Sequence, residues 1–252
     1  MTLLGIHLRQ PAAGGAVRIC VATSGRIPGY MPSTIEILNE KIEEKHLLKN
    51  AFYQAWTKGE LSLDDLRSYS RQYFAHVRAF PAYLSEMHSR CENLDSRQVI
   101  ARNLADEEAT SPTHPELWLD FAAGLGETRE AVLNHPAGPS FTKLVDTFRE
   151  LAKQDTGVAA AALYCYEKQI PAVSNTKIAG LKANYGIQSD DTLRYFSVHE
   201  TADVEHAAEW ETLLERHPIS AQQATEVADR VLDALNGALD EVYSGCACST
   251  VN

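Results

Sequence analysis

The feature of this sequence that most constrains the fold is the polar run from His199 to His206. Each residue of an α-helix turns by about 100°, so Asp203 lies about 40° from His199, and His206 lies about 20° to its other side. The acids Glu200 and Glu205 point about 100° or more away. One narrow stripe therefore carries two imidazoles and a carboxylate, which suit iron, manganese or zinc. The alternative is a helix with polar side chains facing a groove, so ligands from other helices are needed to decide.

The rest of the chain has the pattern of helices from Pro32 onward. Capping residues followed by apolar residues at helical spacing predict helices at about 33–58, 62–91, 174–185, 189–217 and 220–243, with shorter ones between them. No run rich in Val, Ile and Thr alternates with a period of two, so we expect no strands. The sequence predicts one all-α bundle of about seven to nine helices.

Composition and charge exclude several classes of function. The 252 residues are 44% hydrophobic, which allows a core without disulfides or metal. The net charge of −11 argues against non-specific binding to nucleic acid or anionic membranes. No run approaches the ~20 apolar residues of a membrane span. The five cysteines are odd in number and lack a framework spacing, so we expect a reducing cytoplasm.

Three segments differ in composition. Residues 1–30 contain Arg but no acid, so we expect a disordered extension, or one placed before the natural start at Met31. A transit peptide is the alternative explanation for such a basic leader. Residues 31–243 form the folded domain in this interpretation, and residues 244–252 form a tail that contains Cys246 and Cys248.

Three further residues are candidate metal ligands on other helices. Glu107 and His114 are seven residues apart, which would place them on one helical face, although Pro112 disturbs the helix between them. Glu167 ends a strongly apolar run, where an ionised carboxylate must be paired, solvated or bound to metal. A loop position for His114 and a solvated helix end for Glu167 are the alternatives.

The combined set fits two metal ions held inside a helical bundle. It contains three histidines and three carboxylates: Glu107, His114, Glu167, His199, Asp203 and His206. Three carboxylates offset three of the four charges of two divalent ions, although zinc enzymes of hydrolysis use similar ligands. A ferritin-like site needs Glu-x-x-His on two helices, and only Glu43 with His46 has that spacing, so we disfavour that fold.

Several runs also match a known family in register with these six positions. They include Lys58-Gly-Glu-Leu61, Ala79-Phe-Pro-Ala-Tyr-Leu84, Asp106-Glu-Glu108, Gln169-Ile-Pro171 and His199-Glu with His206-Ala. From about Met31 to its end, the chain resembles the chlamydial death-domain-associating protein family, which are haem-oxygenase-like dimetal oxidases involved in p-aminobenzoate formation. The resemblance implies a seven-helix bundle, related to the TenA and pyrroloquinoline-quinone synthase folds. It implies an iron pair or an iron–manganese pair, with dioxygen and an external reductant as co-substrates, and no haem.

The resemblance also implies an unusual substrate. The family is thought to build p-aminobenzoate for folate from its own side chains, and by position these would be the ring of Tyr53 and the amine of Lys177. Tyr166 and Tyr69 would be supporting or redox-active tyrosines. From the residues alone, aromatic packing is the favoured interpretation of Tyr53. Lys177 falls in the first turn of a helix capped by Ser174, where a cation opposes the helix dipole, so it could mark function or be a solvated lysine.

Three alternatives stay open at this point. A dimetal oxidase that acts on an external amino acid or fatty acid would use the same ligands and would need an open apolar pocket beside them. A cofactor-free relative, similar to pyrroloquinoline-quinone synthase, would not need the carboxylates. A non-enzymatic interaction protein would bind metal without oxidation chemistry. The resemblance is compatible with a homodimer and does not identify the electron donor.

Overall fold

The computed structural model describes residues 31–246, and within them it contains eleven α-helices, one 3-10 helix and no strand. The expected all-α bundle is therefore confirmed, but the expected count of seven to nine helices is too low for these residues. The helices are α1 Thr34–Glu44, η1 Leu47–Lys49, α2 Ala51–Lys58, α3 Leu63–Arg90, α4 Leu94–Glu108, α5 His114–Gly124, α6 Arg129–Leu133, α7 Pro139–Ala152, α8 Thr156–Glu167, α9 Ile170–Asn184, α10 Asp190–Arg216 and α11 Ala221–Ser244.

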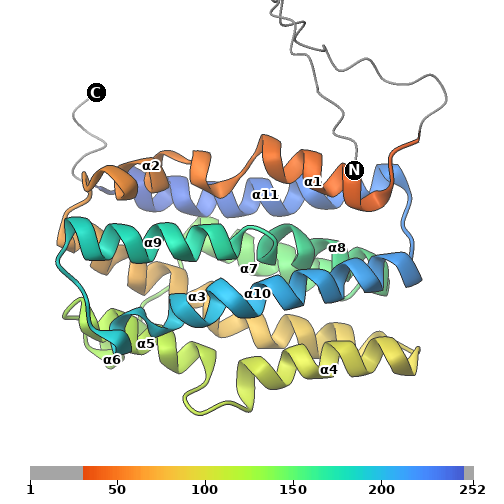
Figure 1. Ribbon diagram of the computed structural model, residues 1–252, viewed down its shortest axis with the longest axis horizontal. Coiled ribbons are helices and arrows are strands. Elements are labelled where there is room, and N and C mark those ends of the chain that lie inside the picture. The colour runs from red at the N-terminus through yellow and green to blue at the C-terminus, as the bar shows by residue number, and fades with distance from the viewer. Residues whose placement is uncertain (1–30, 247–252) are drawn as a thin grey trace, which may run out of the picture. The chain divides into compact units, whose positions relative to one another are not determined.

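The long helices pack side by side around a core rich in aromatic residues. Helices α1 and α2 run along α11 at one edge of the bundle, and α4 and α5 lie near the opposite edge (Figure 1). Helix α10 contacts α5, α8 and α9, while α3 contacts α4, α5 and α7. The polar stripe of α10 therefore faces helices from both halves of the chain.

Most helix boundaries follow the capping residues in the sequence. Ser33, Ser62 and Ser220 each form a capping box, and Gly59 ends α2 in the left-handed conformation with φ of 70°. The predicted single helix over 33–58 is wrong, because the chain breaks into α1, η1 and α2. Polar caps restart it: the side chain of His46 accepts from the Leu48 amide, and Asn50 caps α2.

The start of α9 also differs from the predicted helix start at Ser174, and this difference changes the position of Lys177 within its helix. Helix α9 begins at Ile170, with Pro171 in its first turn, and Ser174 is buried inside the helix rather than capping it. Proline is tolerated in a first turn, because the amide it lacks has no helical partner there. Lys177 therefore lies about two turns into α9, where it is buried, and the expected conflict with the helix dipole does not occur.

A glycine allows α9 to approach α2 closely. A Cβ added at Gly180 would lie 2.6 Å from the indole nitrogen of Trp56, a distance that would force a shift. The same nitrogen donates a hydrogen bond of 3.4 Å to the carbonyl of Lys177. This close packing brings the helix that carries Lys177 beside the helix that carries Tyr53.

The segment predictions extend beyond the described residues. Residues 1–30 and Cys248 lie outside them, so the expectations for the N-terminal extension and for most of the tail stay predictions. Cys246 is described and is buried. Among residues 31–246, no helix combines the length and apolar character needed to cross a bilayer.

Candidate metal centre

The structure brings the six candidate ligands together from four helices. Glu107 lies at the end of α4, His114 is the first residue of α5, and Glu167 is the last residue of α8. The three members of the polar stripe on α10, His199, Asp203 and His206, complete the set, and all six side chains are buried. The stripe spans two clusters, because His199 faces one group of partners and the other two residues face another.

The first cluster contains Glu107, His114 and His199, which each offer one ligand atom within 4.8 Å of the others. Nδ1 of His114 lies 3.0 Å from a carboxylate oxygen of Glu107 but makes no hydrogen bond. Such spacing suits two ligands of one ion, since metal–ligand bonds of ~2.1 Å place neighbouring ligands roughly 3 Å apart. Nδ1 of His199 donates to the carbonyl of Tyr195 at 2.6 Å, which leaves its other nitrogen free for metal.

The second cluster contains Glu167, Asp203 and His206. Nδ1 of His206 lies 3.6 Å from Glu167 and 3.4 Å from Asp203 and has no hydrogen-bond partner. Asp106 contacts the other ring nitrogen of His206 at 3.2 Å, and the indole of Trp210 donates to Glu167. These outer contacts orient the ligands in the manner of metal sites.

The electrostatics of this buried site favour a bound cation. Burial raises the pKa of Glu167 to about 8 and the pKa of Asp203 to about 6, although the neighbouring His206 acts to lower both pKa values. Burial alone would lower the pKa of His206, but the neighbouring carboxylates of Asp203 and Glu167 outweigh it and raise the pKa to about 12. The pKa of His199 falls well below its usual value because of burial and the neighbouring His114. A proton on His206 thus supplies positive charge beside the carboxylates, where a metal ion would otherwise neutralise them.

A small cavity lies against both clusters. Its volume is about 10 Å³, and buried residues form its wall: His76, Val77, Phe80, Glu107, Tyr166, Glu167, Tyr195, His199 and Asp203. A space of this size holds about one water molecule. A cavity of this size does not accommodate an external amino acid or fatty acid.

The predicted amine lies in a cage of aromatic rings. Nζ of Lys177 is 4.9–5.6 Å from the centres of five rings, which belong to Tyr53, Tyr69, Tyr73, Trp118 and Phe196. It also lies 2.6 Å from the hydroxyl of Tyr69. Burial lowers the pKa of Lys177 to about 7, so a large fraction of the amine is neutral at physiological pH.

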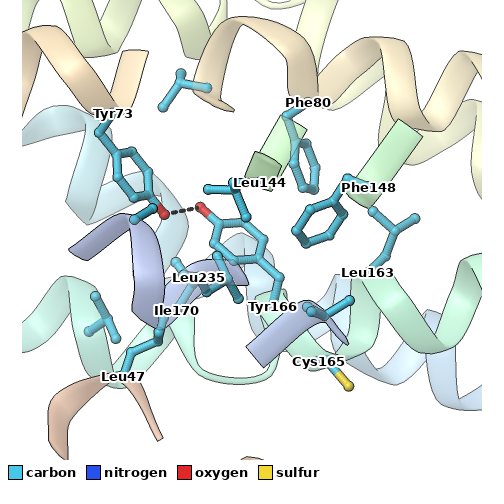
Figure 2. Packing of buried hydrophobic residues seen from close by; sticks show 14 of the residues in the cluster. Leu47, Tyr73, Phe80, Leu144, Phe148, Leu163, Cys165, Tyr166, Ile170 and Leu235 are labelled. Atoms are coloured by element: carbon cyan, nitrogen blue, oxygen red, sulfur yellow. Dashed lines mark hydrogen bonds between the residues drawn. The ribbon is translucent and has the colours of Figure 1, made fainter. Parts of the chain in front are cut away.

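A row of phenols joins the cavity to this cage. Tyr166 lines the cavity, and its hydroxyl lies 3.3 Å from the hydroxyl of Tyr73 (Figure 2). The rings of Tyr73 and Tyr69 are 5.2 Å apart, and the amine of Lys177 lies over the rings of both Tyr69 and Tyr53. All four tyrosines are buried. The structure thus connects all of the tyrosines that the sequence analysis singled out.

Sequence reasoning missed several residues of this site. Tyr73 and His76 follow Tyr69 by four and seven residues on α3, so helical spacing could have placed them on one face. Asp106 and Trp210 contact the ligands, and no sequence signal distinguished them from their neighbours. Of the Glu43 and His46 pair, which has the ferritin-like spacing, Glu43 is exposed and its carboxylate bonds to Lys49, as expected for a solvated face.

Comparisons with known proteins support both the fold and the chemistry. A family model described as an iron-containing redox enzyme matches residues 67–237. A 4-aminobenzoate synthase of Chlamydia pneumoniae is 40% identical over 215 residues, which cover 85% of this chain and 93% of that protein. A TenA homologue of Pseudomonas syringae has a TM-score of 0.73 at 15% identity, covering 84% of this chain and 93% of that one. Haem oxygenase-1 of Synechocystis in complex with haem has a TM-score of 0.61 at 14% identity, covering 84% and 92%. The structural likenesses show the haem-oxygenase-like fold alone.

Adjacent acids on α4 provide a matched test of the ligand assignment. Glu107→Gln removes the charge of a buried candidate ligand, while Glu108→Gln changes an exposed acid one residue away. We expect Glu107→Gln to weaken metal binding by more than about tenfold and to lower the metal content from two ions per chain toward one. Elemental analysis after loading with iron and manganese measures this. Equal metal content in the two variants would contradict the assignment.

Proposed function

This chain belongs to the family of iron-containing redox enzymes, and on that basis we propose that it forms 4-aminobenzoate for folate biosynthesis by a dioxygen-dependent oxidation of its own side chains. The observation that carries the proposal is the amine of Lys177, buried 5.4 Å from the ring centre of Tyr53 and linked to the candidate metal centre by tyrosines. The 4-aminobenzoate synthase that it resembles matches 85% of the chain.

The six candidate ligands fit a pair of metal ions. Their unpartnered atoms include Nδ1 of His114, one oxygen of Asp203 and Nδ1 of His206, all buried. Metal ions held there would supply the activation of dioxygen. An iron pair and an iron–manganese pair are both consistent with imidazole and carboxylate ligands, and metal availability decides between such pairs.

The skeleton of the product explains why Tyr53 and Lys177 are the proposed substrates. In 4-aminobenzoate the nitrogen is para to the carboxylate, just as the hydroxyl of tyrosine is para to Cβ. The ring and Cβ of Tyr53 therefore contain every carbon of the product, and the nitrogen of Lys177 takes the place of the hydroxyl. The small volume of the cavity, about 10 Å³, gives an external aromatic substrate no room beside the ligands.

The bonds that change follow from this correspondence. A carbon–nitrogen bond forms between Nζ of Lys177 and the ring carbon that holds the hydroxyl of Tyr53, while the bond from that carbon to oxygen breaks and the oxygen leaves as water. The Cα–Cβ bond of Tyr53 and the Cε–Nζ bond of Lys177 also break. Cα takes a hydrogen, Cε is oxidised to an aldehyde, and Cβ is oxidised to the carboxylate carbon. Dioxygen is the oxidant, and an external reductant supplies the further electrons that its reduction requires. Because both donors are residues of the chain, each chain acts once.

The buried tyrosines between the two sites have a role in this scheme. Tyr166, Tyr73 and Tyr69 pass a one-electron oxidation from the cavity toward Tyr53, whose ring shares the cage around Lys177 with Tyr69. The hydrogen bond of 3.3 Å between Tyr166 and Tyr73 lets a proton move with the electron. Burial raises the pKa of Tyr73 to about 12, which keeps its proton in place until it is oxidised.

The reducing cytoplasm is the compartment that fits this chemistry. Within residues 31–246, Cys91 and Cys165 are free and buried. Free thiols persist where the surroundings are reducing, and such surroundings also supply reductant.

Removing the hydroxyl of Tyr53 tests the proposed substrate. We expect Tyr53→Phe to bind metal normally but to form no 4-aminobenzoate, because the ring carbon that should accept nitrogen lacks oxygen. Tyr164→Phe is the matched control, since Tyr164 is a buried tyrosine whose hydroxyl bonds to Asn39 and Glu211 instead. Product is assayed after addition of dioxygen and reductant, and the intact mass of each chain is measured in parallel. Product from Tyr53→Phe at the level of the control would contradict the proposal.

The state of Lys177 predicts how the reaction depends on pH. Burial holds the pKa of the amine at about 7, and only the neutral amine is a nucleophile. The single-turnover rate should therefore rise with pH through about 7 and level off above it, when metal loading is completed beforehand at one pH. Rapid-quench measurement of product gives this profile. A rate that falls across this range would contradict the role of the neutral amine.

A further inference from the structure

His76 is a buried polar residue that the scheme above does not use. It lies on α3, its side chain is fully buried, and it lines the cavity that also contacts Glu107, Glu167, His199 and Asp203. Among residues 31–246, Nε2 of His76 has no hydrogen-bond partner. A buried nitrogen without a partner is costly, so its retention beside a cavity needs an explanation.

The other ring nitrogen of His76 is held by a second buried residue. Nδ1 lies 3.4 Å from the hydroxyl of Tyr83, one helical heptad further along α3. A phenol is a better donor than acceptor, so the hydroxyl donates to Nδ1 and the proton of the neutral ring resides on Nε2. Burial lowers the pKa of His76 to about 3, which keeps the ring neutral. The free nitrogen is therefore a hydrogen-bond donor.

The cavity offers a ligand for this donor. At about 10 Å³ it accepts only a molecule of roughly the size of water, and the candidate metal ligands form part of its wall. Dioxygen and its reduced forms are small and accept hydrogen bonds without donating them in their unprotonated states. We propose that His76 donates a hydrogen bond to dioxygen held in this cavity, and that Tyr83 orients His76 for this task.

This inference rests on the proposed function, because it assumes a metal centre that binds dioxygen. It adds a subsite beyond the six ligands and the phenol row. A competing explanation is a contact between Nε2–H and the ring of Tyr166, whose centre lies 4.9 Å from that of His76 at an interplanar angle of 88°. If Nε2–H is directed at that ring, substitutions at His76 should not change the affinity for a diatomic ligand.

Nitric oxide is a diatomic probe that separates these explanations without turnover. Full-length protein loaded with ferrous iron is titrated anaerobically with nitric oxide, and its affinity and N–O stretching frequency are measured. We expect His76→Phe to weaken binding by about tenfold, the usual effect of one lost hydrogen bond, and to shift the N–O stretch. His76→Gln, which keeps an N–H donor, should retain most of the affinity.

Two tyrosine variants control for structural effects. Tyr83→Phe should weaken nitric oxide binding less than His76→Phe does, because the ring stays but its tautomer is no longer fixed. Tyr164→Phe removes a buried hydroxyl that bonds to Asn39 and Glu211 and should change nothing. Circular dichroism and iron content check folding and loading, and His76→Gln and Tyr83→Phe decide the matter if His76→Phe does not fold.

The outcomes distinguish this inference from the function on which it rests. Unchanged affinity and N–O stretch in His76→Phe would overturn the subsite and leave the proposed function intact. A lower iron content in that variant would make His76 a ligand and would also overturn it. The expected loss of affinity, together with an intact Tyr53 side chain after exposure to dioxygen, would support the subsite and contradict the proposed function.

Discussion

Three carboxylates buried in one small region of the bundle create the constraint on which the rest of the site depends. Glu107, Glu167 and Asp203 lie in surroundings where unpaired negative charge is strongly unfavourable. The neighbouring imidazoles compensate only when protonated, as the raised pKa of His206 shows. Two divalent ions would offset this charge and occupy all of the unpartnered ligand atoms. The convergence of α4, α5, α8 and α10 makes structural sense as the framework of such a centre.

Burial has a second consequence at the other end of the phenol row. The cage around Lys177 excludes water, and the same exclusion favours the neutral amine and keeps the nearby phenols protonated. An oxidised tyrosine in such surroundings is shielded from solvent reductants. In the proposed scheme the protein would separate two tasks, with dioxygen bound among polar ligands and the ring and amine held among aromatic side chains.

The sequence alone predicted that the three candidate ligands of α10 share one stripe, because a helical period fixes which side chains share a face. It could not divide the stripe between two clusters, since that depends on how Glu107 and Glu167 approach from other helices. The placement of Lys177 was wrong for a local reason: Pro171 begins α9 instead of ending the helix before it. Tyr73 and His76 were not predicted as functional residues, because a buried residue at helical spacing looks the same in sequence whether its side chain packs or reacts.

The central claim is that the atoms of the product come from the chain itself. The most direct measurement is to build ring-labelled tyrosine and side-chain nitrogen-labelled lysine into the protein, supply unlabelled amino acids in solution, and analyse the product by mass spectrometry. We expect 4-aminobenzoate that contains both labels, at no more than one molecule per chain, together with peptides altered at Tyr53 and Lys177. Unlabelled product, or several turnovers with both residues intact, would contradict the account and point to an external substrate.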